Sequence, residues 1–143
     1  MKPAPRVLIA DDEATLRDLL ALNLEASGFE VLVADDGVSA LNMIRKFHPD
    51  VVVLDVMMPN LDGLAVLQVV RSHPETPDTR VIILSAKATD DDVWSGWRSG
   101  ADCYLTKPCG IGQLLDAITS VLSGTSLIAQ AARPSLATSA SNE

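Results

Sequence analysis

The 143-residue sequence is short of cysteine and of basic residues, and each shortage excludes a class of protein. Its two cysteines, Cys103 and Cys109, are too few for a disulfide framework, and without further cysteines or a histidine cluster they make no zinc site. We expect both to be ordinary packing residues. With 11 Lys and Arg against 19 Asp and Glu, the net charge is −8, which argues against nonspecific binding to nucleic acid or to an anionic membrane.

The sequence also has no long apolar run and no nucleotide-binding loop. No stretch approaches the ~20 apolar residues that a membrane span needs, and residues 1–5 lead into a strand pattern instead of a signal-peptide core. Neither G-x-G-x-x-G nor G-x-x-x-x-G-K-S/T follows a predicted strand. We therefore expect a cytoplasmic protein with one domain, residues 1–123, and a flexible Ala- and Ser-rich tail over residues 124–143.

Short runs rich in Val, Ile and Leu alternate with helical patterns along the chain. The predicted strands span residues 6–10, 29–34, 51–55, 80–85 and 102–106, and the clear helical stripes span 16–26, 40–47, 64–71 and 111–122. A further helix beginning near Asp90 is less regular, because Gly96 and two Trp residues interrupt its stripe. The alternation predicts an α/β fold: a doubly wound, five-stranded parallel sheet with right-handed crossovers and five helices on its two faces.

Four of the predicted strands end on residues that can carry chemistry. These residues are Asp11 and Asp12, Asp55, Ser85 and Lys107. In a doubly wound sheet, such strand ends converge at the point where the winding direction reverses. Taken singly, either Asp12 or Asp55 could cap a helix, Ser85 could belong to a turn, and Lys107 could be solvated. Their occurrence together favours a functional site.

The residue types at this edge suit phosphoryl transfer. Three neighbouring carboxylates repel one another unless a hard cation lies among them, and an all-oxygen site with few protein ligands suits Mg²⁺. In such a site the Asp55 carboxylate would attack phosphorus, and Mg²⁺ and Lys107 would neutralise charge on the equatorial oxygens. Ser85 would donate a hydrogen bond to one of these oxygens.

Four motifs in this order carry a family resemblance over about Arg6 to Leu122. They are Ala10-Asp11-Asp12-Glu13, Leu54-Asp55-Val56-Met57-Met58-Pro59, Leu84-Ser85-Ala86 and Gly100-Ala101-Asp102-Cys103-Tyr104-Leu105-Thr106-Lys107-Pro108. The sequence resembles the receiver domain of bacterial two-component response regulators. The resemblance implies a flavodoxin-like fold with sheet order 2-1-3-4-5.

By this resemblance, Asp55 accepts a phosphoryl group from the phosphohistidine of a sensor histidine kinase or phosphotransfer protein. Asp12 would ligate Mg²⁺ directly and Asp11 mostly through water. Asp55 and the backbone carbonyl of Met57 would complete the protein's share of the ligands. Lys107-Pro108 resembles the family's cis peptide, which an X–Pro bond allows at low cost.

The resemblance also implies a switch pair and an output face. The Ser85 hydroxyl would move toward the phosphoryl group as the Tyr104 ring turns inward. The fourth helix, fifth strand and final helix would form the output face, which would bind a downstream protein or a second copy of the chain and not nucleic acid or membrane. We expect Val93, Trp97 and Ala101 to share the helix face that borders Tyr104, with Trp97 as a partner or dimer anchor. Alternatively, Trp97 fills core space.

The sequence departs from the family pattern in one place. Cys109 stands where Phe commonly follows Lys-Pro, and Gly110 and Gly112 weaken the start of the final helix, so we expect altered local packing and unchanged chemistry. A haloacid-dehalogenase-type phosphatase would need a second Asp where Met57 stands.

Two further alternatives are an unphosphorylated receiver-like scaffold and the receiver piece of a longer transcriptional regulator. Because no helix-turn-helix-sized segment follows the last predicted helix, we expect a stand-alone receiver of the chemotaxis-regulator type. It would catalyse only its own aspartyl phosphorylation and dephosphorylation.

Overall fold

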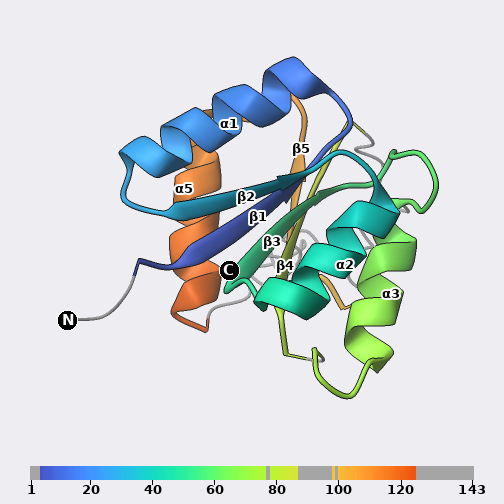
Figure 1. Ribbon diagram of the computed structural model, residues 1–143. Coiled ribbons are helices and arrows are strands. Elements are labelled where there is room, and N and C mark those ends of the chain that lie inside the picture. Colours follow the sequence, from blue (N-terminus) through green and yellow to red (C-terminus); the bar gives the residue numbers. More distant parts are fainter. Residues whose placement is uncertain (1–3, 77, 87–97, 99, 125–143) are drawn as a thin grey trace, which may run out of the picture.

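One parallel sheet of five strands forms the centre of the molecule (Figure 1). The computed structural model describes residues 4–76, 78–86, 98 and 100–124. The strands are β1 (Arg6–Ala10), β2 (Glu30–Ala34), β3 (Val51–Asp55), β4 (Arg80–Ser85) and β5 (Cys103–Thr106). Their order in the sheet is β2-β1-β3-β4-β5, with all neighbours parallel. The predicted flavodoxin-like α/β fold and its strand order are therefore confirmed.

Helices cover both faces of this sheet. The described helices are α1 (Ala14–Ala26), α2 (Gly37–Phe47), α3 (Gly63–Ser72) and α5 (Ile111–Leu122). Figure 1 shows α1 and α5 together on one face and α2 and α3 together on the other. The fourth helix predicted near Asp90 lies outside the described residues. Within the part of the chain that the structure describes, no helix has the length and apolar character to cross a bilayer.

The burial of the strands follows from their place in the sheet. β3 lies between β1 and β4, and all five of its residues are buried. A strand covered on both faces has no polar side to present, which explains its unbroken Val and Leu run. β2 is an edge strand and leaves Glu30 and Val33 exposed. The chain moves from β1 outward to β2 and then crosses to β3, so the winding reverses between β1 and β3, and Asp55 ends β3 at this point.

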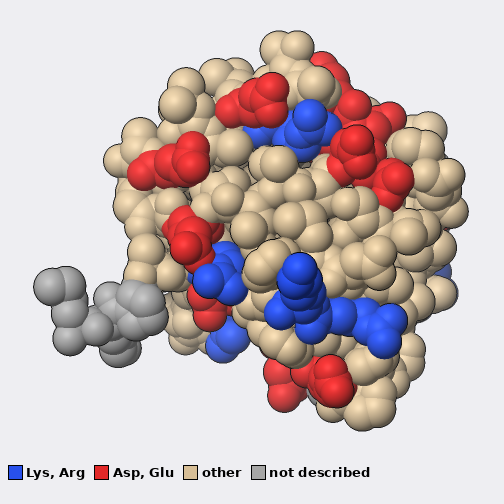
Figure 2. All heavy atoms as spheres, viewed as in Figure 1, with Lys and Arg blue, Asp and Glu red and all other residues tan. Residues whose placement is uncertain are grey.

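Charged side chains are spread over the surface. Figure 2 shows several separate groups of Asp and Glu on one face and a band of Lys and Arg in its lower centre.

Arg45 and Lys46 lie in the last turn of α2, where positive charge complements the helix dipole. At the other end of α2, the Asp36 side chain accepts a hydrogen bond from the Ser39 N–H at 2.7 Å. Asp62 caps α3 in the same way, through the Ala65 N–H at 2.8 Å.

The close approach of Gly63, the first residue of α3, to the end of β3 can be tested by mutation. A Cβ added at Gly63 would lie 2.3 Å from the Asp55 carbonyl oxygen, whereas one added at Gly112 in α5 would have nothing within 4 Å. We expect Gly63→Ala to destabilise the fold by about 2 kcal/mol, because backbone must move. Gly112→Ala should stabilise it by about 0.5–1 kcal/mol. Urea unfolding of both variants tests this pair, and equal stabilities would contradict the packing described here.

Candidate functional site

Three carboxylates meet at the carboxyl edge of β1 and β3. Oxygen atoms of Asp11, Asp12 and Asp55 all lie within 4.8 Å of one another. Asp11 and Asp55 are buried, with 2% and 6% of their surface exposed, whereas Asp12 is exposed. Because the ends of adjacent parallel strands coincide, the fold brings these acids together from positions more than forty residues apart.

Lys107 joins the two buried carboxylates. Its Nζ donates hydrogen bonds to Asp11 Oδ2 at 2.9 Å and to Asp55 Oδ2 at 3.3 Å. The Lys107 backbone N–H donates to the Ser85 carbonyl oxygen at 2.7 Å, which ties the chain after β5 to the end of β4. The peptide bond between Lys107 and Pro108 is cis, as predicted. Four of the predicted site residues, namely Asp11, Asp12, Asp55 and Lys107, therefore form one cluster.

Backbone N–H groups fix the remaining oxygens of the buried acids. The Glu13 N–H donates to Asp11 Oδ1 at 2.9 Å. The Met57 N–H donates to Asp55 Oδ1 at 3.2 Å. Each buried carboxylate thus has one oxygen held by backbone and the other by Lys107, and this arrangement sets the direction in which both carboxylates point.

Burial and neighbouring charges shift the pKa values of Asp55 and Lys107. Burial, followed by the negative charge of Asp11, raises the pKa of Asp55, and Lys107 and the Met57 N–H offset part of that rise. Burial alone would lower the pKa of Lys107, but its hydrogen bonds to Asp11 and Asp55 and their charges raise that pKa overall. Lys107 is therefore held in its charged form, and Asp55 is the acid whose ionised form needs a further positive charge.

The donor set fits a hard divalent cation. Asp12 lines an open cavity of about 470 Å³ that would give an ion and a phosphodonor access to the acids. The other residues that line this cavity are Val56, Met57, Met58, Pro59 and Asp62. Carboxylate and carbonyl oxygens, with room left for water, are the surroundings that Mg²⁺ prefers.

The predicted switch residues lie on the neighbouring strands. Ser85 is fully buried at the end of β4, in register with Thr106 of β5. Tyr104 lies two residues earlier on β5, in register with Ile83, and is half-buried. Ala101 is buried just before β5. The predicted output residues Val93 and Trp97 lie outside the described residues.

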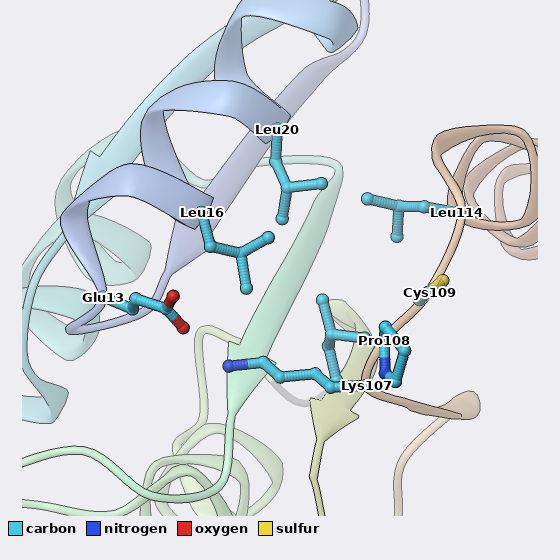
Figure 3. A pocket seen from close by; sticks show the side chains of 8 residues that line it. Glu13, Leu16, Leu20, Lys107, Pro108, Cys109 and Leu114 are labelled. Carbon is cyan, nitrogen blue, oxygen red and sulfur yellow. The ribbon is translucent and has the colours of Figure 1, made fainter.

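A second cavity lies where the sequence departs from the family pattern (Figure 3). It has a volume of about 350 Å³ and separates the start of α1 from the chain after β5. Its lining residues are Glu13, Leu16, Leu20, Leu84, Lys107, Pro108, Cys109 and Leu114. The half-buried Cys109 is one wall of this cavity, and burial raises the pKa of its thiol. The cavity contacts the Lys107 stem and lies beside the acid cluster.

Comparisons with known proteins identify the family of the chain. The sequence matches the response regulator receiver domain family over residues 7–119. The chain therefore belongs to the response regulator receiver domain family. Receiver domains are switches in two-component signalling that are controlled by phosphorylation, receive their phosphoryl group from histidine kinases and bind Mg²⁺ at an acidic cluster.

Two curated relatives illustrate the similarity. The chain is 39% identical over 131 residues to the DNA-binding dual master transcriptional regulator RpaA of Synechocystis, with 92% of this chain and 54% of that protein covered. It is 40% identical over 117 residues to the response regulator MprA of Mycobacterium leprae, with 82% of this chain and 50% of that protein covered. The chain thus spans about half the length of the curated relatives it matches.

Solved receiver domains have the same fold. The receiver domain of the Francisella response regulator 1452 is 38% identical with a TM-score of 0.79, and 84% of this chain and 98% of that chain are covered. The chemotaxis response regulator CheY4 of Vibrio cholerae is 30% identical with a TM-score of 0.78, and the covered shares are 82% and 98%.

The raised pKa of Asp55 predicts a gain of stability when its charge is removed. In metal-free buffer at neutral pH, Asp55→Asn should have a higher free energy of unfolding than the wild type. Because the folded-state pKa is raised, the wild type gains stability as the pH falls through it, so the difference between the two proteins should close by about pH 4. Urea unfolding at several pH values measures this. A variant that is less stable at neutral pH, or a difference that does not change with pH, would contradict the electrostatics described here.

Proposed function

We propose that Asp55 is the phosphoacceptor of this switch. The Asp55 oxygen attacks the phosphorus of a donor phosphohistidine, the P–N bond breaks, and its electron pair returns to the imidazole nitrogen. The observation that carries the proposal is the position of Lys107 Nζ, which is hydrogen-bonded to Asp11 and Asp55. These two acids cluster with Asp12, which lines the open cavity. From this position the Lys107 ammonium can stabilise the negative charge that develops on the phosphoryl oxygens during transfer.

The acid cluster is the proposed metal site. Asp12, Asp55 and the Met57 carbonyl would bind Mg²⁺ directly, and Asp11 would bind it through water. Once bound, the ion would supply charge neutralisation at the phosphoryl oxygens. The exposure of Asp12 supports this assignment, because an exposed carboxylate beside two buried ones can exchange water for a metal and a donor. Asp11 is oriented by the Glu13 N–H and Lys107, which suits an outer position.

Ser85 and Tyr104 are the proposed switch pair. Ser85 ends the strand next to Asp55, since β3 and β4 pair with Asp55 opposite Leu84. Its hydroxyl would donate a hydrogen bond to a phosphoryl oxygen, and the half-buried Tyr104 ring would turn inward behind it. Phosphorylation would thereby change the face formed by the fourth helix, β5 and α5, to which we also assign Ala101 and, outside the described residues, Val93 and Trp97.

The proposed partners act at two separate places. A sensor histidine kinase or phosphotransfer protein would deliver the phosphoryl group at the Asp55 edge, in the cytoplasm. A downstream protein, or a second copy of this chain, would bind the output face. The names of relatives such as RpaA include DNA binding, and a role of this chain as the receiver part of a transcriptional regulator is the second candidate function.

Phosphorylation of Asp55 can be tested by intact mass. With acetyl phosphate and Mg²⁺, the wild type should gain one phosphoryl group, and Asp55→Asn should gain none because it has no nucleophile at that position. Omitting Mg²⁺ should reduce the gain strongly, since the acids then lack their counter-charge. A wild type that stays unmodified, or an Asn variant modified as much as the wild type, would end the proposal.

Met57 predicts a long-lived phosphorylated state. Met57 follows Asp55 by two residues, and it is 61% exposed and lines the open cavity. In this family the residue at this position flanks the path of the attacking water, and a thioether cannot orient that water. We expect Met57→Asn to release phosphate faster than the wild type. Phosphate-release rates that are equal, or faster in the wild type, would count against this role.

A further inference from the structure

The loop between β3 and α3, residues 56–62, is tied to the start of α2 by a polar contact that involves none of the three clustered acids. Asn60 Nδ2 donates a hydrogen bond to Asp36 Oδ2 at 2.9 Å. The other Asp36 oxygen accepts from the Ser39 N–H and caps α2. One carboxylate therefore joins a helix end to a loop that lies 24 residues further along the chain. The pKa of Asp36 is lowered, first by the Ser39 N–H and then by the Asn60 amide, so it stays a charged acceptor.

The backbone around this contact is closely fitted. A Cβ at Gly37 would lie 1.8 Å from the Leu61 carbonyl oxygen, so only glycine allows the loop to approach α2 this closely. The Gly37 N–H points to the Pro59 carbonyl oxygen at 3.4 Å. Asn60 has a φ of 72°, a left-handed conformation that asparagine adopts more readily than most residues. We call Asp36, Gly37, Asn60 and Leu61 the α2 clamp.

The loop carries two groups that act at the proposed site. The Met57 N–H holds Asp55 Oδ1 at 3.2 Å, and the Met57 carbonyl is the proposed backbone ligand of Mg²⁺. The two ends of the loop are joined by the Gly63 N–H, which donates to the Val56 carbonyl oxygen at 2.9 Å. The Met57 side chain is largely exposed, so its own packing does not fix the peptide. Pro59 and Asn60 are exposed as well.

We propose that Asp36 and Asn60 are positioning residues, which act through the β3–α3 loop to hold the Met57 peptide in the geometry that binds Mg²⁺ and orients Asp55. This inference rests on the proposed function. The clamp closes the loop against α2, so the Met57 carbonyl would need no separate ordering step to bind Mg²⁺. Groups that orient metal ligands in this way commonly change metal affinity by roughly 10-fold or more when they are removed.

Asn60→Gly is the decisive variant. It deletes the amide and keeps a residue that tolerates a φ of 72°. We expect Mg²⁺ affinity, measured by isothermal titration calorimetry, to fall about 10-fold, and phosphorylation by acetyl phosphate to require correspondingly more Mg²⁺. Asp36→Asn should stay close to the wild type, because its amide oxygen still caps α2 and its amide nitrogen can bond to a rotated Asn60 side chain.

Two controls separate positioning from general stability. Ile44→Val removes a methylene from a fully buried residue of the same helix and should lower stability without changing Mg²⁺ affinity. In an Asp36→Ala background, Asn60→Gly should have no further effect on that affinity, because the acceptor is already gone.

The outcomes are distinct. Mg²⁺ binding by the wild type with unchanged affinity in Asn60→Gly would overturn the inference and leave the proposed function intact. Additive losses in the double variant, or a loss in Ile44→Val as large as in Asn60→Gly, would also overturn it. A wild type that binds no Mg²⁺ would instead overturn the proposed function together with the clamp's role.

Discussion

The carboxyl edge of the sheet depends on one ammonium group placed between two buried carboxylates. Asp11 and Asp55 are both nearly inaccessible and lie close enough to repel each other, and Lys107 Nζ is hydrogen-bonded to both. Burying like charges together is unfavourable unless a positive charge is shared between them. Lys107 supplies that charge, yet the pKa of Asp55 is still raised. Lys107 thus neutralises only part of the negative charge of the cluster, and a divalent cation bound there would neutralise the rest.

The fold accounts for the convergence of these groups. β1 and β3 are adjacent and parallel, so their carboxyl ends present Asp11 and Asp55 side by side. β4 and β5 extend the same edge, and the Lys107 N–H bonds to the Ser85 carbonyl oxygen where those strands finish. β3 is an unbroken apolar strand buried on both faces, and its packing fixes the position of Asp55 at the carboxyl edge of the sheet. Strand order therefore brings the acids together, and the segments that follow β3 and β5 add the Met57 peptide and Lys107.

Most of this arrangement is readable from the sequence, because it depends on strong local patterns. Short apolar runs that end on polar residues predicted four of the strand ends, two of them acidic, and the motif order placed Asp11, Asp12, Asp55 and Lys107 at one edge, where the structure has them. The α2 clamp was not predicted. Asp36 and Asn60 lie 24 residues apart and share no motif, and only the packing of Gly37 against Leu61 brings them together. The cavity beside Cys109 was not predicted, since its size depends on how α1 and α5 lie.

The most direct test of the account is whether beryllium trifluoride, a mimic of an aspartyl phosphoryl group, assembles at this edge. Fluorine NMR of the wild type with Mg²⁺ should show a protein-bound beryllium trifluoride signal that disappears when Mg²⁺ is chelated. Lys107→Met should lose or greatly weaken that signal while the protein stays folded, because the fluorine atoms stand where the phosphoryl oxygens would meet the ammonium. A bound signal that survives in Lys107→Met or without Mg²⁺, or no bound signal in the wild type, would contradict the claim that Asp55, the metal and Lys107 work as one site.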